Sequence, residues 1–368
     1  MKVTCMSKNR EIFTCDLEDG SITAIHEILD EDHMPIILQG EVPSLELYNQ
    51  WLKGRKIPEN RLGLKKARKL YPKFEAYHNM FSLSDQYWFR YKRETWEKGN
   101  FFTNPFDEDL GRIFFEPWTV QKLSETPDLT TNGVLRKRWA IRDGKRMLIK
   151  AGSKSYHQNP ISEVLASMTL EQLDMIPFVK YSLTVDGLSL CCICENFIDE
   201  NTEYVPCIHV YGKRQRDRYD AIYHHVIRTA KAYGIEDAQD FVDRMICADH
   251  FICNTDRHLG NFGYIRDVES GKLIRFAPLF DCGSAFFSTS TTSDKFPDFE
   301  EECIKKFLPE LKKKGAKADK LIRLIHQYPL ITDEQEKYII KNINRVYKEL
   351  AQSQAERLKD LRDDDPIF

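Results

Sequence analysis

Three polar side chains flank a predicted β-hairpin in the last third of the chain. Asp256 and Asn261 lie five residues apart after a predicted helix, 237–253, and Asp281 follows the hairpin, 262–276. Phosphoryl transfer needs a carboxylate that orients the nucleophilic hydroxyl, and oxygen ligands for Mg²⁺, which takes only one or two protein carboxylates. Because a hairpin folds back on itself, Asp281 would return to the side of Asp256 and Asn261. The pattern predicts a phosphoryl-transfer site.

Each of these residues also has a purely structural interpretation. Asp256 and Asn261 could cap a loop after a helix, and His258 between them could be a hydrogen-bonded loop residue. What favours a site is the order of the whole stretch: helix, D-x-x-x-x-N loop, hairpin, then Asp281-x-Gly283. The glycine would let the chain turn sharply after a metal ligand. This order is typical of the larger lobe of a kinase.

The residues from about 119 to 198 predict a small antiparallel sheet. Asp143-Gly144 joins two strand-like runs, which is a strong hairpin signal because the turn requires positive φ and glycine adopts it freely. Asp186-Gly187 joins a second pair of runs. The four predicted strands are residues 137–141, 146–150, 181–185 and 190–194.

One helix is expected between these two hairpins. Asn159 would be its N-cap and Pro160 its first residue. An apolar stripe follows at Ile161, Val164, Leu165 and Met168. Glu163 lies about 200° around the helix from Ile161, away from that stripe.

The chain is expected to divide into three parts. Residues 1–118 would form a separate α/β domain of unknown role, residues 119–198 the small sheet with its helix, and residues 199–368 a larger helical unit. In the last part we expect helices over 217–232 and 237–253. Further helices are expected in 300–361, broken at Pro309, Gly315 and Pro329.

Two features of composition mark the N-terminal part. An aromatic stretch, 87–106, indicates a core or a domain interface, with a base-stacking platform as the alternative. A basic stretch, 53–69, indicates a solvated helix face, with a phosphate-contacting surface as the alternative.

Overall composition is typical of a soluble globular enzyme. The 368 residues are 42% hydrophobic and 30% charged, and the net charge of −3 argues against a generally basic nucleic-acid-binding surface. No apolar run approaches the roughly 18 residues of a membrane helix, and the start lacks a signal-peptide stretch. We therefore expect a cytoplasmic protein. Its ten cysteines would be reduced, and the Cys191–Cys194 pair would be buried thiols rather than a zinc site.

The polar stretch resembles known kinases. Asn254-Thr255-Asp256-x-His258-x-x-Asn261 is similar to the N-T-D-x-H-x-x-N signature of HipA-like serine/threonine kinases, and its D-R-H-x-x-N also resembles that of phosphoinositide 3-kinase-type enzymes. Asp281-Cys282-Gly283 is similar to the D-F-G of protein kinases. The resemblance covers about residues 119–320. It implies a two-lobed, protein-kinase-like α+β fold, with a small antiparallel sheet lobe with one helix, a larger helical lobe and an extra N-terminal α/β domain.

The resemblance also implies roles for the loop residues. Asp256 would be the catalytic base, Asn261 and Asp281 would bind Mg²⁺, and His258 would support the loop or the transferring phosphate. HipA-like loops commonly carry lysine where this chain has Gly260.

The small sheet would bind ATP. Met147-Leu148-Ile149-Lys150 is similar to the kinase V-A-I-K, so Lys150 would contact the nucleotide phosphates. Strand alternation places Leu148 on the same face, toward the adenine. Glu163 would orient Lys150 through an ion pair, or else face water.

Two further segments complete the expected nucleotide site. Gly133-Val134-Leu135-Arg136-Lys137 is similar to the G-V-Q-P-K of HipA-like kinases. Its backbone N–H groups and Lys137 would contact phosphate, or Gly133 would mark an ordinary turn. Glu195-Asn196-Phe197 resembles a hinge whose backbone would bond the adenine edge.

We therefore expect an ATP- and Mg²⁺-dependent HipA-like kinase that phosphorylates Ser or Thr of a protein, which could be the chain itself. The alternatives are a nucleotidyltransferase or a lipid or small-molecule kinase of the same fold, or a non-catalytic nucleotide-sensing protein. An antitoxin-like DNA-binding partner is expected, without membrane association or direct nucleic-acid binding. The hydroxyl-rich segment 284–293 would be an activation-type segment open to phosphorylation, or a flexible polar loop.

Overall fold

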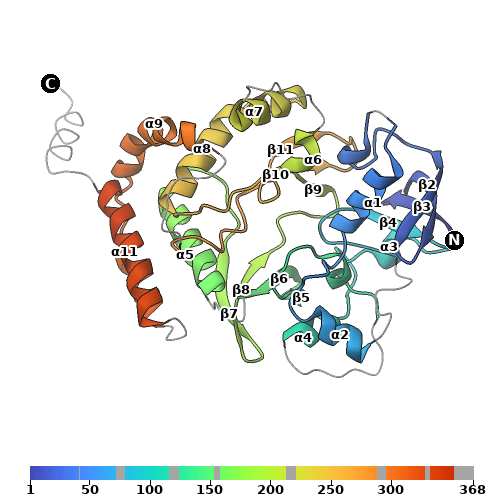
Figure 1. The fold of residues 1–368 in the computed structure, drawn as a ribbon, viewed down its shortest axis with the longest axis horizontal. Helices are drawn as coiled ribbons and strands as arrows, with labels where there is room; N and C mark the ends of the chain where they lie inside the picture. Colours follow the sequence, from blue (N-terminus) through green and yellow to red (C-terminus); the bar gives the residue numbers. More distant parts are fainter. Residues whose placement is uncertain are drawn as a thin grey trace.

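The computed structural model describes most of the chain and combines α-helices with antiparallel sheets. Within the described residues it contains three sheets and eleven α-helices, and Figure 1 shows the N-terminal sheet (blue) on one side of the molecule and the last helices (orange to red) on the other. The described residues are 1–40, 42–71, 79–115, 124–152, 158–212, 221–287, 296–327 and 332–351.

The first sheet is built from the N-terminal strands. Its order is β3-β2-β1-β4, and helix α1 packs on it through an aromatic core that includes Phe13, Tyr48 and Trp51. Ser44 caps α1 by accepting a hydrogen bond from the Leu47 N–H. The bounds are β1 Lys2–Ser7, β2 Arg10–Glu18, β3 Ser21–Ile28, β4 Tyr87–Arg90 and α1 Leu45–Gly54.

The aromatic stretch forms an interface, as predicted. Trp88 and Phe101 pack with Phe81 against Trp139 of the second sheet. Three short helices lie in this region: α2 Leu64–Leu70, α3 Trp96–Gly99 and α4 Asp109–Phe115. The basic stretch is in part a solvated helix face, as predicted, since the lysines of α2 are exposed, but Arg55 and Arg61 in the same stretch are buried.

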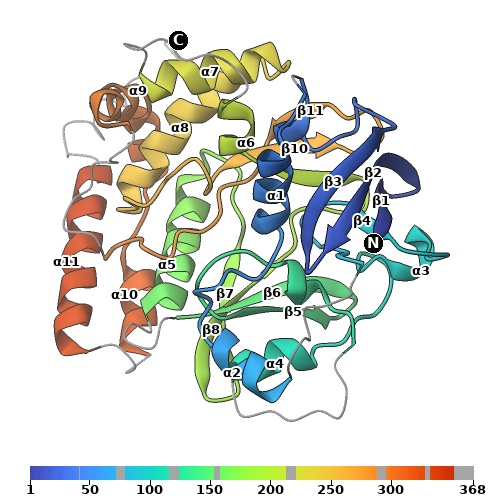
Figure 2. The ribbon, with the colours of Figure 1, turned by 45° about the vertical axis from the view of Figure 1, so that its right-hand side comes forward.

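The second sheet has the order β5-β6-β8-β7 and contains both predicted hairpins. Helices α2 and α4 share a core with one of its faces through Ile149 and Ala151. Helix α5 contacts the sheet on one side and helix α10 on the other, as Figure 2 shows. The bounds are β5 Lys137–Arg142, β6 Lys145–Ala151, β7 Tyr181–Asp186, β8 Ser189–Glu195 and α5 Gln158–Leu173.

Helix α5 differs from its prediction in two ways. It already includes Gln158, so Asn159 is not its N-cap; the Asn159 amide instead donates to the Gly283 carbonyl at 3.1 Å. Because α5 lies between the sheet and other helices, it is buried on nearly all sides. Glu163 is therefore 1% exposed although it lies off the predicted stripe, and the alternative that it faces water is wrong.

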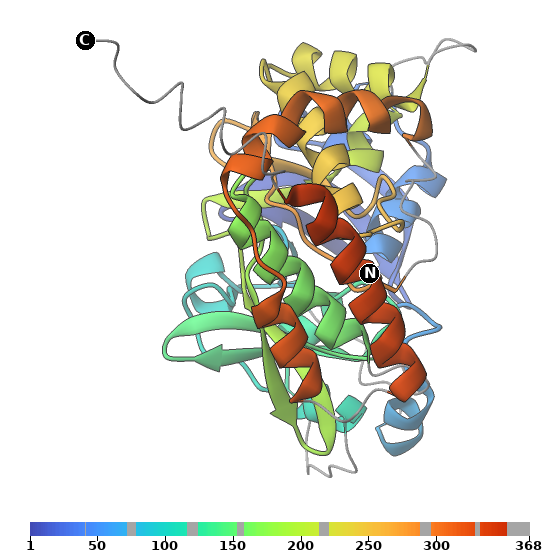
Figure 3. The same cartoon turned by 90° about the vertical axis from the view of Figure 1, so that its left-hand side faces the viewer.

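The remaining residues form a small sheet, β11-β10-β9, and a layer of helices. Figure 3 shows α5, α10 and α11 running side by side, and α10 contacts both of the others. The strands are β9 Thr202–Pro206, β10 Gly263–Asp267 and β11 Leu273–Phe276. The helices are α6 Cys207–Tyr211, α7 Ile222–Ala232, α8 Ala238–Phe251, α9 Glu300–Lys313, α10 Asp319–His326 and α11 Asp333–Leu350.

Of the predicted helix breaks, one is confirmed and one is wrong. Gly315, with a φ of +61°, follows α9, whereas Pro309 lies inside α9. Pro329 lies outside the described residues.

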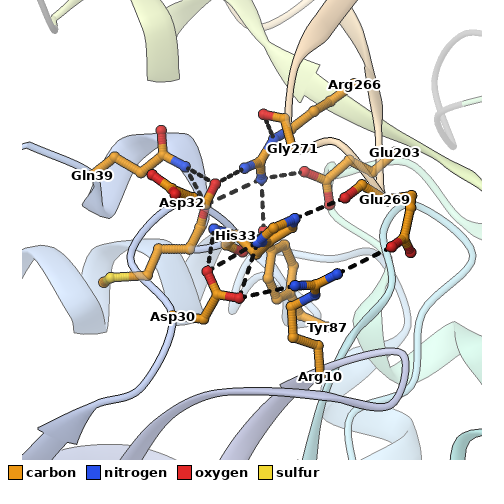
Figure 4. Close-up of polar contacts among 11 residues, drawn as sticks. Arg10, Asp30, Asp32, His33, Gln39, Tyr87, Glu203, Arg266, Glu269 and Gly271 are labelled. Atoms are coloured by element: carbon orange, nitrogen blue, oxygen red, sulfur yellow. Dashed lines mark hydrogen bonds and ion pairs between the residues drawn. The ribbon is translucent and has the colours of Figure 1, made fainter.

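Arg266 on β10 anchors the N-terminal part to the helical part. Its side chain is 2% exposed, and its guanidinium donates to the Glu203 carboxylate and the Tyr87 hydroxyl, each at 2.9 Å (Figure 4). It also donates to the carbonyls of Asp32, at 2.8 Å, and Met34, at 3.0 Å. One buried cation thus joins the first sheet and its following loop to the hairpin β10–β11.

The cysteines are all free and buried, as expected for reduced thiols. Burial is the largest effect on Cys192, whose pKa it raises well above the usual value. In the described part of the chain, no helix combines the length and the apolar character needed to cross a bilayer.

Candidate functional site

The centre of the candidate site is a buried lysine between two carboxylates. Lys150, near the end of β6, is 5% exposed. Its ammonium contacts Glu163 Oε1 of α5 at 2.5 Å and Asp281 Oδ1 at 2.6 Å. Strand alternation in β6 explains the geometry, because it turns Leu148 and Lys150 toward α5 and Ile149 toward α2. The predicted ion pair with Glu163 is present.

Lys150 and the carboxylates beside it shift one another's pKa values toward the charged forms of Lys150 and Asp281. Lys150 lowers the pKa of the Asp281 carboxyl well below its usual range, against the opposing effect of burial. Burial alone would lower the pKa of Lys150, but Asp281 and Glu163 raise it above its usual value. Lys150 and Asp281 are therefore charged at neutral pH, and a cation is fixed where phosphate oxygens could bind.

Glu163 also holds the backbone beside Asp281. Its second oxygen, Oε2, accepts a hydrogen bond from the Cys282 N–H at 2.8 Å. Asp281 has a φ of +57°, a left-handed conformation that costs a non-glycine residue roughly 1 kcal/mol or more. The sharp turn predicted at Gly283 thus lies at Asp281 itself. Glu163 stabilises this turn and orients Lys150 at the same time.

Arg257 joins the Asp256–Asn261 loop to the Asp281 segment. It is 1% exposed and pairs with Asp249 of α8 at 2.9 Å. Its Nη1 donates to the carbonyls of both Asn261 and Phe280, each at 2.8 Å. One guanidinium group therefore fixes Asn261, which lies just before the hairpin, and Phe280, which lies just before Asp281. This contact brings the two separated parts of the motif together.

The loop presents its polar groups in different ways. Asp256 is exposed, and its backbone carbonyl accepts a hydrogen bond from the Asn261 amide at 2.9 Å. Asn261 is 7% exposed, and its Oδ1 accepts no hydrogen bond from a described residue. The loop is thus closed by Asn261, which leaves one amide oxygen available.

His258 fills the space that a larger residue at position 260 would need. Its Nδ1 accepts the Gly260 N–H at 3.0 Å, and its ring is exposed. A Cβ on Gly260 would lie 3.0 Å from His258 Cε1, closer than ordinary contact. Gly260 therefore allows the close packing of the His258 ring on the turn, and the ring supports the turn through its hydrogen bond.

The donors fit Mg²⁺ by their chemistry. Asp281 uses Oδ1 for Lys150 and keeps a second carboxylate oxygen, and Asn261 keeps its amide oxygen. These are hard oxygen donors, and Mg²⁺ commonly binds one or two carboxylates with water and phosphate completing its shell. Among the described residues, no group of three or more His, Cys, Asp or Glu side chains could hold a metal. A carboxylate–amide pair does not require such a group.

Lys137 lies directly across the sheet from Lys150. The two residues are paired in the register of β5 and β6. No described residue forms a hydrogen bond or ion pair with the half-buried Lys137 ammonium. Removal from water, together with Lys150, lowers the pKa of Lys137 to about 7. Two like charges facing each other destabilise a sheet, so an anion bound between them would be favoured.

Gly133 makes room for Lys137. Its φ is +97°, and a Cβ there would lie 2.5 Å from Lys137 Nζ. The positive φ favours glycine at this position, and its missing side chain leaves room for the end of the Lys137 side chain.

The predicted hinge lies at the end of β8. Glu195 is exposed and pairs with Lys145 at 2.6 Å, so its side chain faces away from Lys150. Phe197 stacks on Phe280 with 5.5 Å between ring centroids. Of the predicted hinge residues, Phe197 therefore contacts the residue just before Asp281.

Several residues that organise the site were not singled out from sequence. Arg257 lies inside the motif, but only its burial with Asp249 shows its role. Asn254 accepts a hydrogen bond from the Ser284 hydroxyl at 2.8 Å. Of the hydroxyl-rich segment, 288–293 lie outside the described residues.

Known proteins resemble this chain in sequence and in fold. Residues 128–328 match the family model described as HipA-like C-terminal domain. The Shewanella oneidensis MR-1 HipA structure, solved with HipB and operator DNA, is 13% identical with a TM-score of 0.59, covering 99% of this chain and 100% of that one. The Helicobacter pylori proinflammatory kinase CtkA is 16% identical with a TM-score of 0.49, covering 63% and 94%. No curated protein matches.

Proposed function

Because the chain belongs to the HipA-like family, we propose that it is an ATP- and Mg²⁺-dependent kinase that phosphorylates Ser or Thr of a protein, with itself as one substrate. The observation that carries this proposal is Lys150 held between Glu163 and Asp281. A phosphoryl-transfer site needs a fixed cation for the nucleotide phosphates and a carboxylate beside them. We infer further that residues 119–198 and 199–368 are the two lobes of the kinase and 1–118 an additional domain.

Each residue of the site would have a separate role in binding or in transfer. Lys150 and Lys137 would bind the phosphates of ATP, and the backbone of Glu195-Asn196-Phe197 would receive the adenine. Asn261 and Asp281 would hold Mg²⁺, which when bound neutralises phosphate charge. Asp256 would orient the acceptor hydroxyl and accept its proton.

The accessibility of Asp256 supports a macromolecular acceptor. Its side chain is exposed, and no described residue forms a hydrogen bond or ion pair with its carboxylate. His258 beside it is also exposed. An exposed carboxylate can meet a hydroxyl on a protein surface, whereas an enclosed one would restrict the acceptor to small molecules.

The proposal is tested by incubating the purified chain with ATP and Mg²⁺ and measuring its intact mass. We expect addition of phosphate to the wild type and none to Asp256→Ala, with the fold checked by circular dichroism. Asp240→Ala, an exposed residue of α8, is the matched control and should retain transfer. Addition of AMP would support a nucleotidyltransferase, and full phosphate transfer by Asp256→Ala would reject the assigned role.

We also propose an antitoxin-like DNA-binding partner. The support is the fold shared with Shewanella HipA, which was solved with HipB and operator DNA. The chain alone, with a net charge of −3, should bind DNA weakly, and a partner should confer salt-dependent binding. A gel-shift titration of the chain with and without copurified proteins tests this.

A further inference from the structure

The N-terminal part of the chain reaches the loop expected to cover the phosphates. Arg61 Nε donates to the Gly133 carbonyl at 2.5 Å, and its Nη2 donates to the Thr131 carbonyl at 2.7 Å. The neighbouring Leu62 N–H donates to the Val134 carbonyl at 3.0 Å. Three carbonyls of one short loop are thus bound from the same side, by residues about 70 positions away in the sequence.

These contacts decide where the loop's N–H groups point. In a planar trans peptide, the C=O and the following N–H point in opposite directions. Fixing the three carbonyls toward Arg61 and Leu62 therefore turns the N–H groups of Asn132, Val134 and Leu135 the other way. Within the described residues, none of these three N–H groups donates a hydrogen bond. Backbone N–H groups arranged in this way are suited to an anion.

Arg61 itself is an unusual residue to bury. It is 3% exposed, its Nη1 is buried without a hydrogen-bond partner, and among the described residues no carboxylate forms an ion pair with it. Burial lowers the pKa of Arg61 to about 10, so it is charged at neutral pH. The buried carboxyl of Asp128 acts on Arg61 electrostatically without forming an ion pair with it, and an anion bound nearby would further offset the cost of burying this cation.

The positive charges converge on this loop. Both Lys150 and Arg61 lower the pKa of Lys137 beside Gly133, which places all three cations within electrostatic reach of one another. Asp281 and Glu163 form ion pairs with Lys150, whereas Lys137 and Arg61 form none with the residues that the structure describes. The remaining charge is appropriate for a polyphosphate.

Arg61 is also held by a fixed frame. Ile57 and Leu64, on either side of it, pack in one core with Ile149 of β6. The N-terminal part is anchored at its other end by Arg266 (Figure 4). The loop is therefore braced by a segment that contacts both the sheet and the β10–β11 hairpin.

We propose that Arg61 is a positioning residue of the nucleotide site, which holds the 131–134 loop so that its N–H groups face the phosphates. The inference rests on the proposed function and assigns residues 1–118 a role in it, the positioning of the phosphate loop. The ligand class is a nucleoside di- or triphosphate. Because Arg61 acts on the phosphate loop, its loss should weaken binding of ATP and leave binding of adenosine unchanged.

The test compares MgATP and adenosine binding by calorimetry for the wild type, Arg61→Met and Arg61→Lys. Arg68→Met is the matched control, because Arg68 pairs with Glu59 on the surface of the same region. We expect Arg61→Met to raise the dissociation constant for MgATP by about tenfold or more, because the variant loses charge-assisted hydrogen bonds. Adenosine affinity should change less than about twofold, and Arg68→Met should alter neither ligand.

The outcomes separate the two proposals. If Arg61→Met lowers the affinities for MgATP and adenosine equally, or if it folds and binds MgATP as the wild type does, Arg61 does not position the phosphate loop. If Arg61→Met does not fold, Arg61→Lys provides the test. This variant keeps the positive charge but loses the two hydrogen bonds to the loop carbonyls, so it should weaken binding of MgATP and leave binding of adenosine unchanged. A wild type that binds MgATP without transferring phosphate would overturn the kinase and leave this inference standing. A wild type that binds neither ligand would overturn both.

Discussion

If Lys137 binds the phosphates of ATP as proposed, the affinity for ATP should depend on pH, and the size of the effect can be calculated. In the free protein its pKa is about 7, because removal from water and the charge of Lys150 both favour the neutral amine, while Asp281 opposes them. Bound phosphates would favour the charged form and raise the pKa toward its ordinary value of about 10.5. ATP binding at alkaline pH must therefore take up a proton, and affinity should fall as pH rises above 7.

The size of the effect follows from linkage. With these two pKa values, the protonated fraction of free Lys137 falls from about one half at pH 7 to about one hundredth at pH 9. The dissociation constant for ATP should therefore rise by up to about 50-fold over this range, an upper limit because water partly screens a half-buried ammonium. Proton uptake at pH 8 should approach about 0.9 per ATP.

Calorimetry in buffers of different ionisation enthalpy measures both the dissociation constant for ATP and the number of protons taken up on binding. Lys137→Met should bind ATP weakly with a much flatter dependence on pH. Lys145→Met, on the same hairpin but paired with Glu195 at the surface, should keep the wild-type slope. An affinity that is constant from pH 7 to 9 in the wild type, or a slope that survives in Lys137→Met, would refute the reasoning.

Three further predictions concern the framework of the site. Glu163→Gln should reduce transfer by at least about tenfold in steady-state assays, because the charge that orients Lys150 is lost while the Cys282 N–H keeps its acceptor; unchanged turnover would contradict this. Arg257→Met leaves Asp249 buried without its partner and should cost about 3–5 kcal/mol in urea unfolding, and a loss below about 1 kcal/mol would argue against the assigned role. Burial favours neutral His250, but two carboxylates on its ring nitrogens raise its pKa to about 9. Charged His250 should make its full contribution to the free energy of unfolding below about pH 6.5 and lose it as pH rises through 9. In urea titrations at several pH values, His250→Gln should lack this part of the pH dependence of the unfolding free energy.

Local patterns predicted the parts of the site that depend on neighbouring residues. The Asp-Gly turns fixed the hairpins, and strand alternation then placed Lys150 and Leu148 on the face of α5. The register also set Lys137 opposite Lys150. Each of these depends on residues within about 15 positions of one another.

Features that depend on tertiary packing could not be predicted in the same way. An amphipathic stripe identifies the buried face of a surface helix, but α5 is enclosed by a sheet and other helices, so Glu163 is buried off the stripe. Asn159 has the type of an N-cap, yet a more distant acceptor, the Gly283 carbonyl, binds its amide. Arg61 carries no local signal at all, because its partners are about 70 residues away.

The central claim is that Asp281, held beside Lys150, takes part in phosphoryl transfer. The most direct measurement is the transfer of labelled γ-phosphate by the wild type and by Asp281→Asn, at equal protein concentration, with ATP and Mg²⁺. The account predicts that the wild type becomes labelled and that Asp281→Asn, folded as shown by its urea unfolding transition, does not. Labelling of Asp281→Asn at the wild-type rate would contradict it.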